Sequence, residues 1–186
     1  MKDKITSIIG SSRGNVRRVY NSVDTLRFKP DLQARSEFRA KFGISDNDIV
    51  IGFIGRLSWV KGVDIAIEAF NIAKKKCPNI KLLIVGDGSD EKKLKQQARQ
   101  SLFAADIIFT GFCGEAEKAI NAFDIAVVPS RCEAFGIVVL ELIACQVPVI
   151  GSSADGIKEI ITDRIDGIIT DGSSKEIASQ IQELLS

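Results

Sequence analysis

Histidine is absent from the 186-residue sequence. This absence excludes Ser-His-Asp and Cys-His catalysis within the chain, because both use an imidazole as the general base. It also removes the commonest metal-ligating side chain. Cysteine is sparse, and no two of the four residues form a C-x-x-C pair: Cys77, Cys113, Cys132 and Cys145. We therefore expect reduced, mostly buried thiols and neither a metal site nor a redox dithiol.

The sequence also lacks long apolar runs and a basic stripe. No apolar run reaches the ~18 residues that a membrane span requires, and MKDKITSIIG at the start lacks a secretory h-region of adequate length. Net charge is +1 with both signs interspersed, so no nucleic-acid partner is expected. We expect a cytoplasmic protein. Arg13, Arg17 and Arg18 are interpreted as a solvated surface; the alternative is peripheral contact with the anionic inner face of a membrane.

From residue 49 onward, short β-branched runs alternate with longer helical segments. Because the runs are apolar throughout, they are typical of strands buried on both faces, at 49–55, 81–86, 106–111, 124–130, 147–153 and 167–170. Helices are expected between and after them, at 63–76, 89–102, 115–123, 136–145, 156–162 and 173–185. Six strand–helix units predict an α/β fold, a doubly wound Rossmann-like domain with a six-stranded parallel sheet.

The first 48 residues have a different pattern and are interpreted as an N-terminal arm. Residues 21–30 end in a proline and are expected to be extended, and residues 36–44 are expected to form a short helix that Gly43 stops. The chain is therefore predicted to be a single domain, residues 1–186. Its core is 49–186.

Several predicted strands end in glycine or serine, which indicates where a ligand binds. In open α/β sheets, ligands lie beyond the carboxyl ends of the strands. The expected site is therefore built from the loops at 55–62, 86–90, 111–115, 130–138 and 153–157.

The stretch GRLSWVKG at 55–62 carries two cations, Arg56 and Lys61, around a turn that leads into a helix. Two cations beside a helix N-terminus suit a phosphate group. The alternative is a pair of solvated charges on a loop.

The segment EAFGIVVLE places Glu133 and Glu141 on either side of a predicted helix start near Gly136. The free N–H groups of Gly136, Ile137 and Val138 favour an anion. At ~1.5 Å per helical residue the carboxylates are of order 10 Å apart, which suits one long ligand with hydroxyls at both ends and a phosphate between. Alternatively, Glu133 only complements the helix dipole and Glu141 is a surface residue, although the neighbours of Glu141 are apolar.

Two nucleotide-binding patterns are incomplete, and a sugar-transferase pattern lies at the wrong edge of the sheet for the site. Gly86-Asp87-Gly88 has Glu91 where a dinucleotide fingerprint needs its third glycine, and there is no GK[ST] of a P-loop. Asp46-Asn47-Asp48 has a D-x-D form, but it precedes a strand and is interpreted as a turn.

Taken together, the motifs resemble the C-terminal donor-binding domain of a family 4 (group 1) glycosyltransferase of the GT-B fold. The resemblance runs along nearly the whole chain, through YNSVDTLRFKP, GRLSWVKGVDIAIEAF, LLIVGDG, FTGFCGEAEKAINAFDIAVVPS and the E-x7-E motif EAFGIVVLE, in the order of the family. Ser22 and Gln146 stand where the family usually has glycine, and Asp155-Gly156 replaces a commoner Gly-Gly.

The resemblance implies roles for individual residues. Arg56 and Lys61 bind the donor diphosphate, and Glu133 contacts the transferred sugar; these three carry the catalytic step. Glu141 binds the ribose, and the backbone around Cys113 meets the base. Backbone groups of Phe135, Gly136, Ile137 and Val138 contact sugar and phosphate. The family retains configuration and generally needs no metal, so no cofactor is expected.

The resemblance also implies partners. These are a nucleotide sugar and a preceding acceptor-binding domain, with a glycan or lipid as acceptor of the transferred hexosyl group. Two alternatives stay open: a non-catalytic nucleotide-sugar-binding half that completes a partner chain, and an epimerase or phosphorylase of the same fold.

Overall fold

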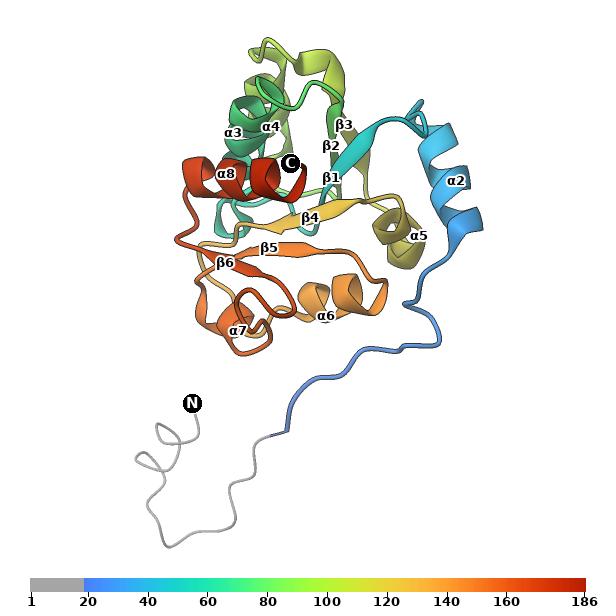
Figure 1. Ribbon diagram of the computed structural model, residues 1–186, viewed down its shortest axis with the longest axis vertical. Coiled ribbons are helices and arrows are strands. Elements are labelled where there is room, and N and C mark those ends of the chain that lie inside the picture. Colours follow the sequence, from blue (N-terminus) through green and yellow to red (C-terminus); the bar gives the residue numbers. More distant parts are fainter. Residues whose placement is uncertain (1–18) are drawn as a thin grey trace, which may run out of the picture.

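Six parallel strands form one sheet in the order β3-β2-β1-β4-β5-β6 (Figure 1). The computed structural model describes residues 19–186, so the predicted arginine cluster at 13–18 lies outside the described residues. The strands are β1 (Ile49–Ile54), β2 (Ile80–Val85), β3 (Ile107–Gly111), β4 (Ile125–Val128), β5 (Val149–Ser152) and β6 (Ile168–Thr170). This order reverses direction between β1 and β4, as in doubly wound folds, and confirms the predicted fold class.

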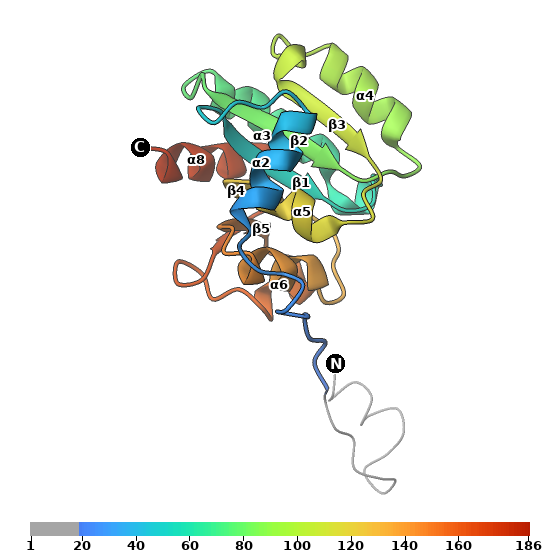
Figure 2. The same ribbon diagram turned by 90° about the vertical axis from the view of Figure 1, so that its right-hand side faces the viewer.

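Helices cover both faces of the sheet (Figures 1 and 2). One face packs against α3 (Val63–Lys74), α4 (Glu91–Arg99) and α8 (Ser174–Leu184). The other packs against α2 (Leu32–Lys41), α5 (Ala116–Asn121), α6 (Ile137–Ala144) and α7 (Asp155–Lys158). Two short 3₁₀ turns, η1 (Trp59–Lys61) and η2 (Ala104–Asp106), complete the order. Because both faces are covered, the strands are apolar along their length.

The register of the central strands aligns their carboxyl ends. β1 and β2 pair over their full length, from Ile49 opposite Ile80 to Ile54 opposite Val85. Gly55 and Gly86 therefore follow side by side, and a Cβ at Gly86 would lie 2.0 Å from the Gly55 carbonyl oxygen. Only glycine permits this approach, at φ 132°. The loops after β1 and β2 consequently start in contact.

The arm differs from its prediction in two places. α2 begins at Leu32, four residues before the expected start at 36, because the Asp31 side chain accepts from the Ala34 N–H and caps the helix. The segment predicted as extended at 21–30 contains a turn. Asp24 Oδ1 accepts from the Leu26 N–H at 2.9 Å, and the Asp24 carbonyl accepts from Phe28 N–H at 2.8 Å. An aspartate that bonds backbone N–H groups ahead of it favours such a turn.

Asp124, just before β4, ties α2 to the sheet. Its carboxylate accepts from Arg35 Nη2, from Arg39 Nη2 and from the Val50 N–H. The Arg39 side chain is 3% exposed, and it also donates to the Ala122 and Asp48 carbonyls. Three donors converge on one carboxylate, so this cluster satisfies a buried charge that would otherwise be costly.

The C-terminus of α6 has a residue in the left-handed region. Gln146 has φ 59°, its N–H donates to the Ile143 carbonyl, and Val147 N–H donates to the Leu142 carbonyl. This is the Schellman arrangement, which glycine adopts without strain. This left-handed backbone explains why glycine is usual at the corresponding position of the family that the sequence resembles.

We expect Gln146→Gly to stabilise the domain by about 0.5–1 kcal/mol, because glycine removes the left-handed strain. Thermal denaturation should show a midpoint about 1–4 °C higher. The same change at Gln100, where φ is −81°, is the control and should not stabilise. A lower midpoint for Gln146→Gly would contradict this account of the helix end.

Candidate functional site

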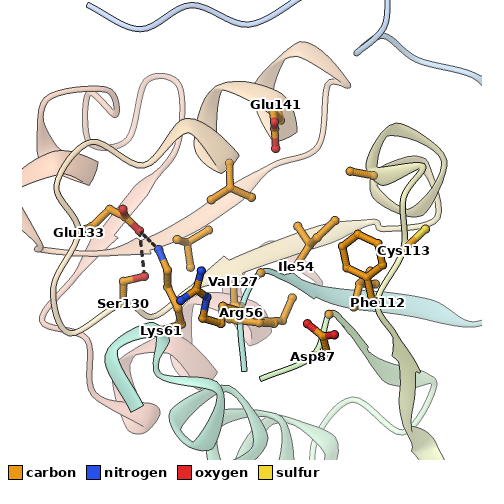
Figure 3. Close-up of a pocket in the computed structure, with 17 residues that line it drawn as sticks. Ile54, Arg56, Lys61, Asp87, Phe112, Cys113, Val127, Ser130, Glu133 and Glu141 are labelled. Carbon is orange, nitrogen blue, oxygen red and sulfur yellow. Dashed lines mark hydrogen bonds and ion pairs between the residues drawn. The ribbon is translucent and has the colours of Figure 1, made fainter. Parts of the chain in front are cut away.

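A cavity of about 380 Å³ opens at the carboxyl ends of β1, β2 and β4, where ligands bind in open α/β sheets. Figure 3 shows its labelled side chains converging from separate loops. The charged and polar lining residues are Arg56, Lys61, Asp87, Cys113, Ser130, Glu133 and Glu141. Apolar and glycine residues complete it: Phe53, Ile54, Gly55, Val85, Gly86, Phe112, Ala116, Val127, Val128 and Val138.

The structure gathers most of the predicted site residues in this cavity. Arg56, Lys61, Cys113, Glu133, Val138 and Glu141 all line it, whereas Phe135, Gly136 and Ile137 do not. The predicted loop at 153–157 is also outside the lining. Instead, the Gly156 N–H donates to the Glu133 carbonyl at 3.0 Å, so that loop supports the backbone of Glu133 from behind.

Lys61 and Glu133 form an ion pair, with Lys61 Nζ 2.6 Å from Glu133 Oε2 (Figure 3). Ser130 Oγ also donates to Glu133 Oε2, at 3.4 Å. An ammonium has three donors and a carboxylate has two acceptor oxygens. The pair therefore leaves Lys61 able to bind a phosphate and Glu133 able to accept from a hydroxyl, so the two predicted roles are compatible.

Arg56 is the second cation at the cavity. Its side chain is exposed, and among residues 19–186 no hydrogen bond or ion pair engages its guanidinium. A guanidinium carries five N–H donors in a planar fork that matches phosphate oxygens. Arg56 is thus available to an anion without giving up a protein partner.

The N-terminus of α6 faces the same region through Val138. The helix starts directly after Gly136, at φ 89°, and no side chain caps it. The predicted start near Gly136 is confirmed. The Val139 N–H donates to the Gly136 carbonyl at 2.9 Å, whereas the Ile137 and Val138 N–H groups have no acceptor within the helix. The helix dipole favours an anion there by about 0.3–1 kcal/mol. Arg56, Lys61 and this helix end therefore favour the same kind of ligand group.

Glu141 lies at a different part of the cavity from the Lys61–Glu133 pair (Figure 3). It is on the cavity side of α6. Burial raises the pKa of the Glu141 carboxyl above its usual value; the Arg27 charge lowers that pKa and Glu117 raises it further. A half-buried carboxylate lining a cavity is poised to accept hydrogen bonds from a ligand that replaces its lost water.

Sequence reasoning missed the residue that joins two loops of the site. Arg131 donates to both carboxylate oxygens of Asp64 at 2.8 and 2.6 Å, and to the Trp59 carbonyl at 2.6 Å. Its guanidinium stacks 4.8 Å from the Trp59 ring centroid, and Asp64 holds its pKa above the usual range. Arg131 precedes Glu133 by two residues, so it fixes the turn carrying Lys61 against the loop carrying Glu133.

Gly62 permits that close contact. It has φ 69°, and a Cβ there would lie 2.1 Å from the Pro129 carbonyl oxygen at the end of β4. Any larger residue would push the turn away from the loop after β4. The distance between Lys61 and Glu133 therefore depends on a glycine as well as on Arg131.

The Asp46-Asn47-Asp48 segment has a structural role. The predicted turn at 46–48 is confirmed: Asp48 N–H donates to the Ser45 carbonyl, and Ser45 N–H donates to Asp48 Oδ2 at 2.8 Å.

Within residues 19–186, no three His, Cys, Asp or Glu side chains stand close enough to hold a metal ion. No helix in that same range has the length and apolar character that crossing a bilayer needs.

Known proteins share both the sequence and the fold. Residues 34–186 match the family model described as Glycosyl transferases group 1. A GDP-mannose-dependent alpha-(1-6)-phosphatidylinositol monomannoside mannosyltransferase of Mycolicibacterium smegmatis is 34% identical over 173 residues, covering 88% of this chain and 45% of that protein. The chain therefore spans less than half of this relative.

Solved structures agree. Anabaena HepE in complex with UDP and glucose superposes with a TM-score of 0.82 at 29% identity, over 90% of this chain and 46% of that chain. The C-terminal domain of the group 1 glycosyl transferase LpcC from Francisella tularensis gives a TM-score of 0.79 at 32% identity, over 88% of each chain. With the family match over residues 34–186, these findings show that the chain belongs to the group 1 glycosyltransferases.

Proposed function

We propose that this chain binds a nucleotide-diphosphate sugar and is the donor-binding part of a retaining, family 4 hexosyltransferase that acts on a glycan or lipid acceptor. The observation that carries the proposal is the convergence, in one cavity, of Arg56, Lys61 and an uncapped helix end with two separate carboxylates, Glu133 and Glu141. The two cations and the helix end suit the diphosphate, and the two carboxylates suit hydroxyls of the transferred sugar and of the ribose.

The positions of the side chains suggest one orientation of the donor. The diphosphate lies at Arg56, Lys61 and the start of α6, and the transferred sugar at Glu133. The ribose lies at Glu141, and the base at the loop containing Phe112 and Cys113. Complexes of HepE with UDP and glucose, and the GDP-mannose dependence in the name of the mycobacterial relative, support a nucleotide sugar while differing in the base.

The chemistry follows from this orientation. The bond between the anomeric carbon and the diphosphate oxygen breaks, and Arg56, Lys61 and the α6 N-terminus stabilise the charge on the departing diphosphate. A non-bridging oxygen of that phosphate takes the proton of the acceptor hydroxyl, which attacks from the same face. Configuration is therefore retained without a covalent intermediate on this chain.

A second candidate is a binding half that acts only with a partner domain. Incubation with UDP-glucose and GDP-mannose, followed by chromatography of the products, distinguishes both candidates from an epimerase. Binding without turnover is expected of both, whereas conversion of the nucleotide sugar without acceptor would contradict both and indicate an epimerase. Light scattering with a separate acceptor-domain chain tests the second candidate, which requires a stable complex of the two chains.

Glu141→Gln tests the ribose contact. A neutral amide keeps the shape but loses a charge-assisted hydrogen bond, which is worth about 1.5–3 kcal/mol. We expect the affinity for UDP or GDP, measured by calorimetric titration, to fall about 10- to 100-fold. The matched control is Glu159→Gln, on the loop after α7, which should leave affinity unchanged. Equal binding by Glu141→Gln would remove Glu141 from the donor site.

The same variant is expected to be more stable than the wild type at neutral pH. Burial raises the folded-state pKa of Glu141 above its ordinary 4.5. The stability associated with the protonated carboxyl is therefore present below pH 4.5 and is lost as pH rises through the folded pKa, because burying the ionised carboxylate carries a penalty. The Gln variant lacks this penalty. Thermal denaturation should show a higher midpoint, by about 1–3 °C at pH 7, and a smaller difference at pH 4. A lower midpoint at pH 7 would contradict the burial effect.

A further inference from the structure

Arg27, from the N-terminal arm, reaches the nucleoside end of the proposed site. Its Nε donates to Glu117 Oε2 at 2.9 Å, its Nη2 lies 2.8 Å from the same oxygen, and Nη2 donates to the Gly114 carbonyl at 3.4 Å. Arg27 and Glu117 are 90 positions apart in sequence. Figure 2 shows the arm crossing α6 before it enters α2, which packs beside α5. The arm therefore contacts the site loop.

The arm is held in place next to Arg27 by packing. Phe28 is 6% exposed and belongs to the apolar cluster beneath α5 and α6, and the guanidinium of Arg27 lies 5.2 Å from its ring centroid. Asn121 of α5 donates to the Lys29 carbonyl and accepts from the Asp31 N–H. Arg27 is consequently presented from a fixed backbone, not from a free tail.

Apart from the packing of Cys113 against the apolar cluster beneath α5 and α6, the loop that Arg27 contacts has few other restraints. Gly111 has φ 75°, and a Cβ at Gly111 or Gly114 would meet nothing within 4 Å. Phe112 is 75% exposed. Within residues 19–186, the Arg27–Gly114 contact is the hydrogen bond that joins positions 112–114 to a distant part of the chain. Residues 112 and 113 line the cavity, so this restraint acts directly on the cavity wall.

Arg27 also changes the charge around Glu141. Its positive charge favours the ionised Glu141, whereas Glu117 disfavours it. By pairing with Glu117, Arg27 offsets the neighbouring carboxylate that opposes ionisation of Glu141. An ordinary surface pair would explain the Glu117 contact alone. It does not explain the additional bond to the Gly114 carbonyl.

We propose that Arg27 is a positioning residue for the nucleoside of the donor: paired with Glu117, it holds the loop at 112–114 through the Gly114 carbonyl. The inference rests on the proposed function. It makes the arm part of the donor site, although none of the arm residues at 19–48 lines the cavity. Arg27 is then expected to affect the nucleoside end and not the diphosphate end.

The test uses Arg27→Ala, Arg27→Lys and the control Arg164→Ala, which removes an exposed arginine–carboxylate pair with Glu183. Calorimetric titrations are run with UDP, GDP, UMP, GMP and inorganic pyrophosphate. For Arg27→Ala we expect a roughly three- to tenfold loss of affinity for the nucleotides the wild type binds, with pyrophosphate within twofold. Arg27→Lys should recover part of the loss, and Arg164→Ala should show none. Amide hydrogen exchange should rise at 112–115 in Arg27→Ala without any ligand.

The outcomes separate this inference from the proposed function. Nucleotide affinity unchanged in Arg27→Ala would overturn the positioning role while leaving the proposed function intact. Equal losses for nucleotides and pyrophosphate would also overturn it, because a general loosening of the fold weakens both ends. If the wild type binds none of the nucleotides, the proposed function fails and the positioning role fails with it, whatever the hydrogen exchange shows.

Discussion

Replacing both Arg56 and Lys61 with alanine is expected to abolish saturable binding of nucleoside diphosphates. Each cation contributes a charge-assisted hydrogen bond to a phosphate, worth about 1.5–3 kcal/mol. Losing both weakens binding by about 100-fold to 10,000-fold. Calorimetric titration measures the loss directly, and uridine or guanosine should be much less affected than the diphosphates.

The control for this double variant is Lys92→Ala/Lys93→Ala. It removes the same formal charge from exposed positions on α4, so an effect of net charge alone would appear in both. Lys61→Ala also leaves Glu133, whose side chain is 11% exposed, without its cation. Arg56→Ala, which breaks no ion pair within residues 19–186, is therefore tested alone and should lose about tenfold or more in affinity for the diphosphates. Wild-type affinity in the double variant would refute the phosphate site.

Asp124→Ala should produce the largest loss of stability of the substitutions considered. It removes the acceptor of Arg35, Arg39 and the Val50 N–H and leaves the buried Arg39 without a counter-charge. Removing one partner of a buried ion pair costs about 3–5 kcal/mol. The thermal midpoint should fall by about 6–20 °C, and urea denaturation should give the corresponding decrease in unfolding free energy.

Glu183→Ala provides the matched comparison. It also removes a carboxylate from an arginine, but the Arg164–Glu183 side chains are each 54% exposed. Exposed pairs contribute about 0–1 kcal/mol, so the midpoint should scarcely move. Equal destabilisation of the domain by Asp124→Ala and Glu183→Ala would show that Asp124 does not attach α2 to the sheet.

The sheet was predictable because strands buried on both faces leave a clear pattern. Each predicted strand overlaps an observed one, and the bounds agree to within two residues. The arm was less predictable. Its helix starts where Asp31 caps it, before Leu32, which is 83% exposed, so apolar periodicity gave no signal there. Asp24 likewise forms a turn through local side-chain bonds in a segment whose proline suggested extension.

The site was predictable only in part. The rule that ligands lie at the carboxyl ends of strands correctly placed Arg56, Lys61, Glu133 and Glu141 in one cavity. The pairing of Lys61 with Glu133 could not be predicted, because these residues are 72 positions apart. The same holds for Arg131 and Asp64, 67 positions apart. Such contacts depend on how the loops after two different strands meet. The spacing of residues in the sequence does not predict the distance between side chains on those loops.

These long-range pairs give the site its geometry before any ligand binds. Arg131 and Gly62 fix the turn that carries Lys61 against the loop that carries Glu133. The Gly156 N–H supports Glu133 from the other side. A preformed site loses less conformational entropy on binding. We therefore expect this chain alone to contain a donor site that is ready to bind a nucleotide sugar.

Calorimetric titration of the wild-type chain with UDP, GDP and ADP shows whether such a site is present. We expect saturable binding of at least one of them at one site per chain, with its sugar conjugate competing for the same site. Absence of saturable binding for all three, with a chain that unfolds cooperatively on heating, would contradict a preformed donor site.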